Sequence, residues 1–196
     1  MEMNLPAAQA EYAVPTRLAD GTAGAHTEAV ADRRDARDAL SLAHAPQAAW
    51  RALDASIRVR TVRHIARYVD DHRDALAATI SADTGTDRFG ALVREVLPAA
   101  CAVDAYCCRA GAFAGRPQPA RRIPTAPVVD VVSVATDART PFLSPLADAA
   151  AALLGGSAVV LVSAPALRRS AAMVAECIEA AALPPDLFQH ACAVSP

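Results

Sequence analysis

The chain contains no lysine, because all 19 of its basic residues are arginine. This absence excludes catalysis through a Schiff base and a phosphate-binding Gly-Lys-Ser/Thr loop, since both need a lysine amine. Aromatic residues are scarce as well, at 4% of the 196 residues, although 54% of the chain is hydrophobic. A core built largely from alanine and other small side chains favours helices over a β-sandwich.

Charge of one sign is not concentrated anywhere along the chain. The formal charge is −2, and no basic run is longer than two residues, which argues against binding to nucleic acid. The nearly uncharged stretch 145–162 is interrupted by Asp148 and by Gly155-Gly156, so it predicts a buried helix and a buried strand and not a membrane span. The amino terminus lacks a basic segment before an apolar one, and we expect a cytoplasmic protein without a secretory signal.

The five cysteines indicate neither a disulfide framework nor a metal site, because their number is odd and none are spaced as Cys-x-x-Cys. Most of them fall within apolar patterns, and we interpret them as mostly buried thiols. For Cys107 and Cys108, which precede Arg109, a lowered thiol pKa is the alternative to burial. The full set is Cys101, Cys107, Cys108, Cys177 and Cys192.

The hydrophobic pattern predicts an α/β fold, in which amino-terminal helices precede a partial doubly wound (Rossmann-like) parallel sheet. Residues 1–25 carry prolines and glycines without a sustained period, and we expect a flexible arm there. Residues 26–196 are predicted to form a single domain. Its helical part, 26–115, is predicted to hold four helices, at 28–46, 54–69, 73–82 and 88–114.

The second part of the domain, 126–196, alternates strands with helices. Strands are predicted at 128–134, 158–162 and 187–194, and helices at 141–154 and 165–182. The valine-rich first strand is of the type that is buried on both faces in parallel sheets. This β-α-β-α-β unit therefore predicts right-handed crossovers and the first half of a doubly wound nucleotide-binding sheet.

Several segments, in order and in register, resemble the amino-terminal, cofactor-binding half of the aldehyde dehydrogenase superfamily. The likeness covers roughly residues 28 to 196 and includes the family's tryptophan helix, its Glu-Thr-Gly-Lys turn, the long helix that follows, and the first crossovers. It implies a truncated, degenerate member of that superfamily. The segments that carry it are Ala48–Leu53, Ile57–Val62, Ser81–Gly85, Glu95–Tyr106, Pro145–Leu161 and Ala182–Phe188.

The departures from the family pattern determine the functional interpretation. The family's Pro-Trp-Asn-Phe-Pro supplies an Asn that helps to hold the developing oxyanion, and that position is Arg139 in this sequence. The Lys and Glu that secure the adenosine ribose in the family correspond to Val162 and Pro165. The likeness also ends at Pro196, before the place of the family's glycine-rich cofactor helix, general-base Glu and nucleophilic Cys. We therefore expect no functional NAD-dependent aldehyde dehydrogenase from this chain alone, and no bound cofactor.

Polar residues at the predicted carboxyl end of the sheet are the candidates for a ligand site, because open α/β sheets bind ligands at that edge. The candidate ligand-pocket residues are Thr136, Asp137, Arg139 and Ser163, of which Asp137 and Arg139 are also the candidate catalytic groups. The alternatives are an exposed ion pair between Asp137 and Arg139 and a helix N-cap at Ser163.

Three functions remain open at this point. The first is a non-dehydrogenase protein that associates with itself or with a protein partner, covering an unpaired edge of its sheet. The second is a scaffold recruited as a cofactor-independent biosynthetic enzyme, of cyclase or isomerase type, with a small-molecule ligand at the carboxyl end of the sheet. The third is residual nucleotide binding. We rank association first.

Overall fold

The computed structural model describes residues 12–13, 33–114, 129–163 and 165–193. Most of the predicted arm, residues 1–25, lies outside these ranges. The α/β fold predicted from the sequence, with helices before a partial Rossmann-like sheet, is confirmed. In chain order the elements are β1 (Tyr12–Ala13), α1 (Arg33–Ala52), α2 (Ala55–Thr84), α3 (Arg88–Ala91), a π-helical turn (Leu92–Val96), α4 (Leu97–Ala114), β2 (Val131–Ala135), α5 (Leu143–Gly155), β3 (Ala158–Ser163), a 3-10 turn (Pro165–Leu167), α6 (Arg168–Glu179) and β4 (Phe188–Ala193).

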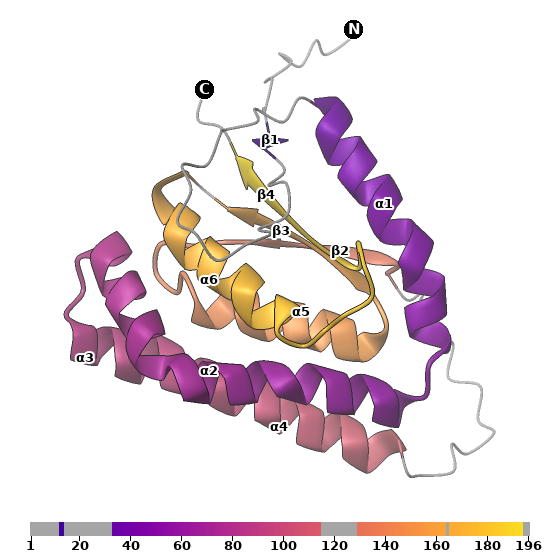
Figure 1. Cartoon of the computed structure of the whole chain (residues 1–196), viewed down its shortest axis with the longest axis horizontal. Coiled ribbons are helices and arrows are strands. Elements are labelled where there is room, and N and C mark those ends of the chain that lie inside the picture. Colours follow the sequence, from indigo (N-terminus) through magenta and orange to yellow (C-terminus); the bar gives the residue numbers. More distant parts are fainter. Residues whose placement is uncertain (1–11, 14–32, 115–128, 164, 194–196) are drawn as a thin grey trace, which may run out of the picture.

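The sheet has the order β1-β4-β3-β2, in which β2, β3 and β4 are parallel and β1 is antiparallel to β4. The short strand β1, which the sequence did not predict, places Tyr12 opposite Ala193 of β4. The predicted three-stranded sheet implied an open edge after its last strand, and β1 covers only the last two residues of that edge, Cys192 and Ala193. At the other end of the sheet, no described strand pairs with the outer side of β2 along its length (Figure 1).

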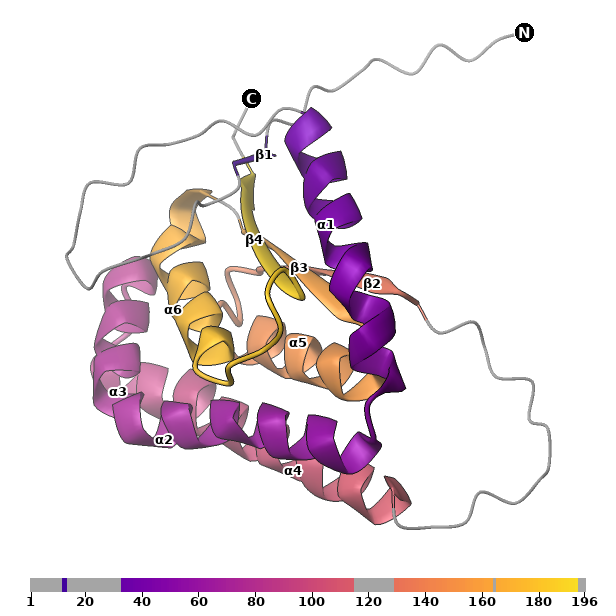
Figure 2. The same ribbon diagram turned by 45° about the vertical axis from the view of Figure 1, so that its right-hand side comes forward.

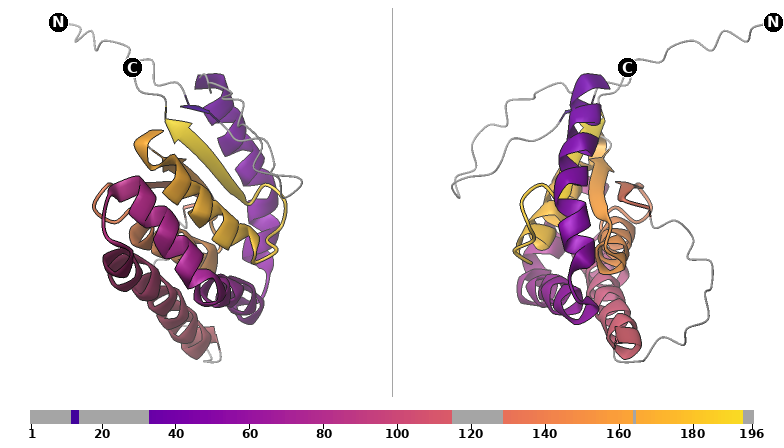
Figure 3. Two further views of the ribbon diagram at one scale, coloured as in Figure 1. Left: turned by 60° about the vertical axis from the view of Figure 1, so that its left-hand side comes forward. Right: turned by 90° about the vertical axis from the view of Figure 1, so that its right-hand side faces the viewer.

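Helices cover both faces of the sheet in layers. α5 and α6 lie on one face, as expected for consecutive right-handed crossovers between parallel strands, and α2 and α4 pack on the outer side of this pair (Figure 1). α1 crosses the opposite face and contacts all three parallel strands (Figure 2 and Figure 3). β3 is therefore buried along nearly its whole length, as its valine-rich sequence predicts.

The first helix runs farther than the sequence predicts. Pro46 is expected to end it, because proline lacks the amide hydrogen that a helix needs, yet α1 continues through Pro46 to Ala52. The turn after the proline is anchored by tertiary contacts, since Gln47 is 5% exposed and Trp50 is 2% exposed. Burial of these side chains offsets the local cost of the proline, which is about 3 kcal/mol in a helix interior.

The second and third predicted helices form one continuous helix, α2. Nothing between Val69 and Arg73 breaks a helix, because the intervening residues include neither proline nor glycine. Leu76 and Ile80 also continue the buried stripe that begins earlier in α2. The helix ends where Gly85 takes a left-handed conformation, with φ of 71°, and donates its amide to the carbonyl of Ser81.

The fourth predicted helix is present, but it contains a π-helical turn just before Pro98. Proline at this position cannot donate to the carbonyl of Arg94, so the regular hydrogen-bond ladder is interrupted there. The amide of Leu97 instead reaches back to the carbonyl of Leu92, five residues earlier. The extra residue in this turn is a local adjustment to the proline.

The carboxyl end of α5 is held by side chains from α1 and α2. The indole nitrogen of Trp50 donates to the carbonyl of Leu153 at 2.8 Å, and the amide of Gln47 donates to the carbonyl of Gly156 at 2.9 Å. Arg58 adds a bond from Nε to the carbonyl of Leu154 at 3.1 Å. The last carbonyls of a helix lack the donor four residues later that interior carbonyls have, and these side chains bond to them; the carbonyl of Leu153 also accepts the amide of Gly156 at 3.1 Å. These side chains fix α1 and α2 onto the sheet unit.

Candidate functional site

The carboxyl ends of β2 and β3 and the amino ends of α5 and α6 lie at one edge of the sheet. Thr136 continues the pairing past β2, because its amide donates to the carbonyl of Val162 at 2.9 Å. Asp137 and Arg139 follow in an exposed loop, where Oδ1 of Asp137 accepts a hydrogen bond from the backbone amide of Arg139 at 3.2 Å. No ion pair joins these two side chains among the described residues. The carboxylate of Asp137 therefore bonds within the loop, and the guanidinium of Arg139 has no ion-pair partner in the described part of the chain.

Ser163, the last residue of β3, is fully buried, and its Oγ lies 3.0 Å from Nε2 of His190 on β4. Burial lowers the pKa of His190 to about 4, so its imidazole is neutral at pH 7. A hydroxyl beside an imidazole is the arrangement of a nucleophile and its base, but Ser163 has no exposed surface on which a substrate could lie. The pair instead satisfies two polar groups between neighbouring strands.

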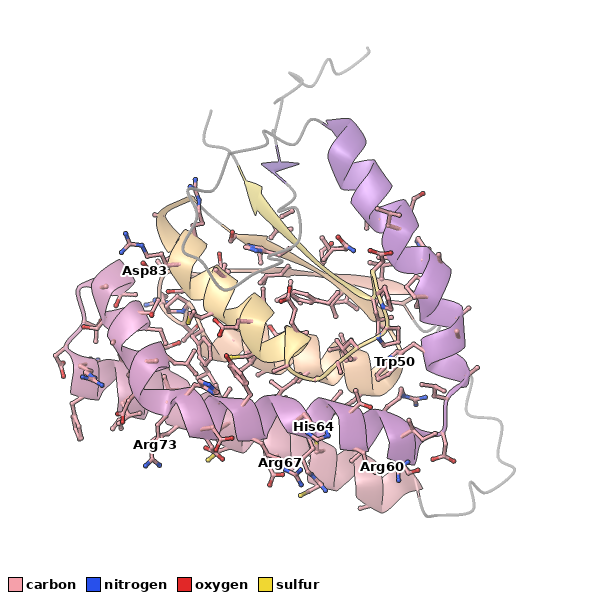
Figure 4. The ribbon with its side chains drawn as sticks, in the orientation of Figure 1. Trp50, Arg60, His64, Arg67, Arg73 and Asp83 are labelled. Atoms are coloured by element: carbon pink, nitrogen blue, oxygen red, sulfur yellow. The ribbon has the colours of Figure 1, made fainter. Side chains whose placement is uncertain are left out.

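Carboxylates from the outer helices occupy the amino ends of both crossover helices. Oε2 of Glu95 accepts from the backbone amides of Phe142 at 3.2 Å and Leu143 at 2.9 Å, where α5 begins. Oδ2 of Asp83 accepts from the amide of Ser170 at 2.6 Å and from its hydroxyl at 2.8 Å, in the first turn of α6. Figure 4 shows Asp83 at the end of α2 that approaches α6. Each carboxylate satisfies free amides at the positive end of a helix.

A cavity of about 230 Å³ opens between the turn after α2, the segment formed by α3 and the π-helical turn, and the loop before α5. Of the four predicted ligand-pocket residues, Arg139 alone lines it. The roles of Thr136, Asp137 and Ser163 in binding a ligand stay predictions. Sequence reasoning missed Arg94 and Glu95, which line the cavity from the π-helical turn. The remaining lining residues are Ile80, Thr84, Thr86, Gly90, Ala91, Ala138, Thr140 and Pro141.

Of the four cysteines whose side chains the structure describes, two are buried and two are exposed. Cys107 and Cys177 are buried, whereas Cys101 and Cys108 are exposed. Burial raises the pKa of Cys107 to about 11 and also raises the pKa of Cys177, so the proposal of a lowered thiol pKa is wrong for Cys107. For Cys192 the structure describes only the backbone, which pairs with Ala13 of β1.

The described residues contain no group of three or more His, Cys, Asp or Glu side chains placed to hold a metal ion. Within the same ranges, no helix combines the length and the apolar character needed to cross a membrane.

Comparison with known proteins confirms the resemblance inferred from the sequence. Solved structures with similar folds include an aldehyde dehydrogenase from Bartonella henselae, with 21% sequence identity and a TM-score of 0.73. The match covers 83% of this chain and 35% of that one. A NAD-dependent benzaldehyde dehydrogenase from Corynebacterium glutamicum is 24% identical, with a TM-score of 0.71, and the match covers 84% of this chain and 37% of that one. Lactaldehyde dehydrogenase from Escherichia coli is 23% identical, with a TM-score of 0.69, and the match covers 85% of this chain and 37% of that one.

The likeness spans only about a third of the length of these enzymes. No curated protein matches the sequence. The model of the aldehyde dehydrogenase family matches residues 10–194, which is nearly the whole chain. The chain therefore belongs to the aldehyde dehydrogenase family and corresponds to the amino-terminal part of its members.

Proposed function

We propose that this chain acts by association, pairing with a second copy along the outer edge of β2, and that it does not oxidise aldehydes on its own. The observation that carries the proposal is the outer edge of β2, with which no described strand pairs. Soluble proteins usually protect such an edge with charged residues, proline or a bulge. β2 has the sequence Val-Val-Ser-Val-Ala and carries neither charge nor proline.

The backbone groups that face this edge follow from the pairing on the other side of β2. The carbonyl of Asp130 and the amide of Thr136 both bond to β3. Backbone groups alternate in direction along a strand, so the even-numbered residues between them also face β3. The amides and carbonyls of Val131, Ser133 and Ala135 therefore point away from β3, toward the open side.

These outward groups suit pairing with an identical strand. If two copies of β2 meet antiparallel with Ser133 on the two-fold axis, Ser133 faces Ser133 and Val131 faces Ala135 of the second copy. All three pairs are then of the hydrogen-bonded type, in which each residue exchanges two bonds with its partner. A self-complementary register of this kind is what an isologous dimer requires. This favours a second copy over an unrelated partner strand.

The residues at the ribose positions of the family support the absence of a cofactor. Val162, which stands where the family has lysine, is a partly buried apolar side chain of β3 and cannot donate a hydrogen bond to a ribose. The amino ends of α5 and α6, which could each bind a phosphate, are already engaged by Glu95 and Asp83. We infer that NAD is not a ligand of this chain.

Replacing Ser133 tests the dimer. Ser133→Lys places two ammonium groups directly opposite each other on the two-fold axis, and like charges in that arrangement destabilise a strand pair. We expect the wild type to behave as a dimer in sedimentation equilibrium and Ser133→Lys as a monomer. Because the side chain of Ser133 is exposed, the substitution should leave the thermal midpoint of the monomer unit unchanged.

Ser133→Thr is the matched control, since it keeps the hydroxyl and adds only a methyl group that suits a strand. It should remain dimeric. A monomeric wild type at high micromolar concentration would contradict the proposal, and so would a Ser133→Lys protein that sediments as a dimer.

The absence of nucleotide binding is tested by thermal unfolding with increasing NAD, NADH, NADP and NADPH. A ligand present at a hundred times its dissociation constant stabilises the folded state by about 2.7 kcal/mol, which is readily visible as a shift of the midpoint. We expect no saturable shift with any of the four. A saturable rise would overturn this part of the proposal and favour residual nucleotide binding.

A further inference from the structure

We propose that the cavity beside Arg94 and Arg139 binds a small oxyanion, the carboxylate or phosphate group of a molecule with roughly eight non-hydrogen atoms. The size follows from the volume of about 230 Å³, taking ~30 Å³ for each water-sized group. This site lies at the carboxyl end of the sheet and is separate from the edge of β2. Its occupation is independent of the association proposed above.

The positive charge of the cavity comes from two guanidinium groups, those of Arg94 and Arg139. Arg94 reaches it from the π-helical turn and Arg139 from the loop before α5. Neither forms an ion pair among the described residues. The planar guanidinium group presents several donors in a fork that matches the oxygens of carboxylate and phosphate.

The carboxylate of Glu95 also lines the cavity, but it accepts hydrogen bonds from the amino end of α5. Glu95 is 7% exposed, and its Oε2 accepts the amides of Phe142 and Leu143 at the positive end of α5. The negative charge is thus compensated by the amino end of the helix and not by either arginine. The lining keeps a net positive charge, which favours an anion.

The threonines of the cavity supply hydroxyl groups beside the arginines. Oγ of Thr84 donates to the carbonyl of Ile80 and accepts the amide of Thr86 at 3.2 Å, which fixes the turn after α2. Thr140 bonds to Ser144 at 2.8 Å on the opposite wall. The polar groups on the two walls are therefore held by hydrogen bonds that do not involve a ligand. A site with pre-positioned polar groups loses less entropy on binding than a disordered one.

Gly90 gives Arg94 the space to lie across this wall. A Cβ atom at position 90 would stand 2.6 Å from Nη2 of Arg94 and 2.8 Å from Oδ2 of Asp87. Both contacts are with the mobile ends of side chains, so Gly90→Ala would displace the guanidinium group and leave the backbone in place. This glycine offers a way to move Arg94 without removing its charge.

The test is a titration of ¹⁵N-labelled protein with inorganic phosphate and, separately, with succinate, followed through the amide signals of Gly90, Thr86 and Ala138. We expect saturable shifts with at least one anion in the wild type. Arg94→Gln and Arg139→Gln should each weaken binding at least tenfold, and Gly90→Ala should weaken it by a similar factor. Stronger binding of phosphate assigns a phosphorylated ligand, and stronger binding of succinate assigns a carboxylic acid.

Arg60→Gln is the matched control, because it removes the same charge at the opposite end of α2 from Asp83 (Figure 4). It should leave the affinity unchanged. The proposal is overturned if neither anion gives saturable shifts in the wild type. It is also overturned if Arg60→Gln weakens binding as much as Arg94→Gln, which would mean that general positive charge attracts the anion.

Discussion

Trp50→Ala is expected to lower the free energy of unfolding by about 3–5 kcal/mol, the usual cost of removing a buried tryptophan. The side chain is 2% exposed and is one of the largest fully buried groups in the structure. Its loss creates a cavity between α1 and α5 and also removes one of the two donors to the carbonyl of Leu153. Urea unfolding, followed by circular dichroism, measures the change.

Two further substitutions separate packing from hydrogen bonding. Trp50→Phe keeps much of the ring and loses the donor, so it should cost about 1–3 kcal/mol, less than alanine. Leu53, which directly follows α1, has a side chain that is 37% exposed. Leu53→Ala should therefore lower the free energy of unfolding by less than about 1 kcal/mol. A Trp50→Ala protein as stable as Leu53→Ala would show that α1 does not pack on α5 as described.

The stability of the protein is expected to fall as the pH is lowered from about 6.5 to 4, because of His190. Its pKa is about 4 in the folded protein, against 6.5 for an exposed histidine, owing to burial. Between these values the unfolded chain binds a proton that the folded protein does not, so acid favours unfolding. The loss approaches about 3 kcal/mol at pH 4, and above pH 6.5 the contribution is fully present.

The difference between wild type and His190→Gln isolates this effect, since other groups titrate alike in both proteins. Glutamine can still bond to Ser163, and its variant should show a shallower decline of stability with acid. His64→Gln, at an exposed position on α2, should follow the wild-type curve. Equal slopes for wild type and His190→Gln would contradict a buried neutral imidazole.

The sheet unit could be predicted from the sequence because its local signals agree with its tertiary structure. Valine-rich runs predicted β2 and β3, and Gly155-Gly156 predicted the turn between α5 and β3. The failures arose where tertiary contacts override local preference. Pro46 did not end α1, because Trp50 and Gln47 are anchored on α5, more than 100 residues away in sequence.

The candidate site was predicted only in part, for a related reason. Arg139 was found from its place after a strand. Glu95 and Asp83 were missed as helix-capping groups, because their partners lie 47 and 87 residues away and no sequence spacing reveals them. Arg94 could have been noticed four residues after Gly90, but only the structure shows that this glycine makes room for it.

The most direct test of the proposed association is a mixture of two charge variants at the two-fold axis. Ser133→Lys and Ser133→Glu should each be monomeric alone, because like charges face each other across the strand pair. Mixed in equal amounts, they should form a heterodimer, since opposite charges then meet at the same point. Sedimentation or native mass spectrometry would detect it. If the mixture stays monomeric while the wild type dimerises, the copies do not meet through β2 in this register.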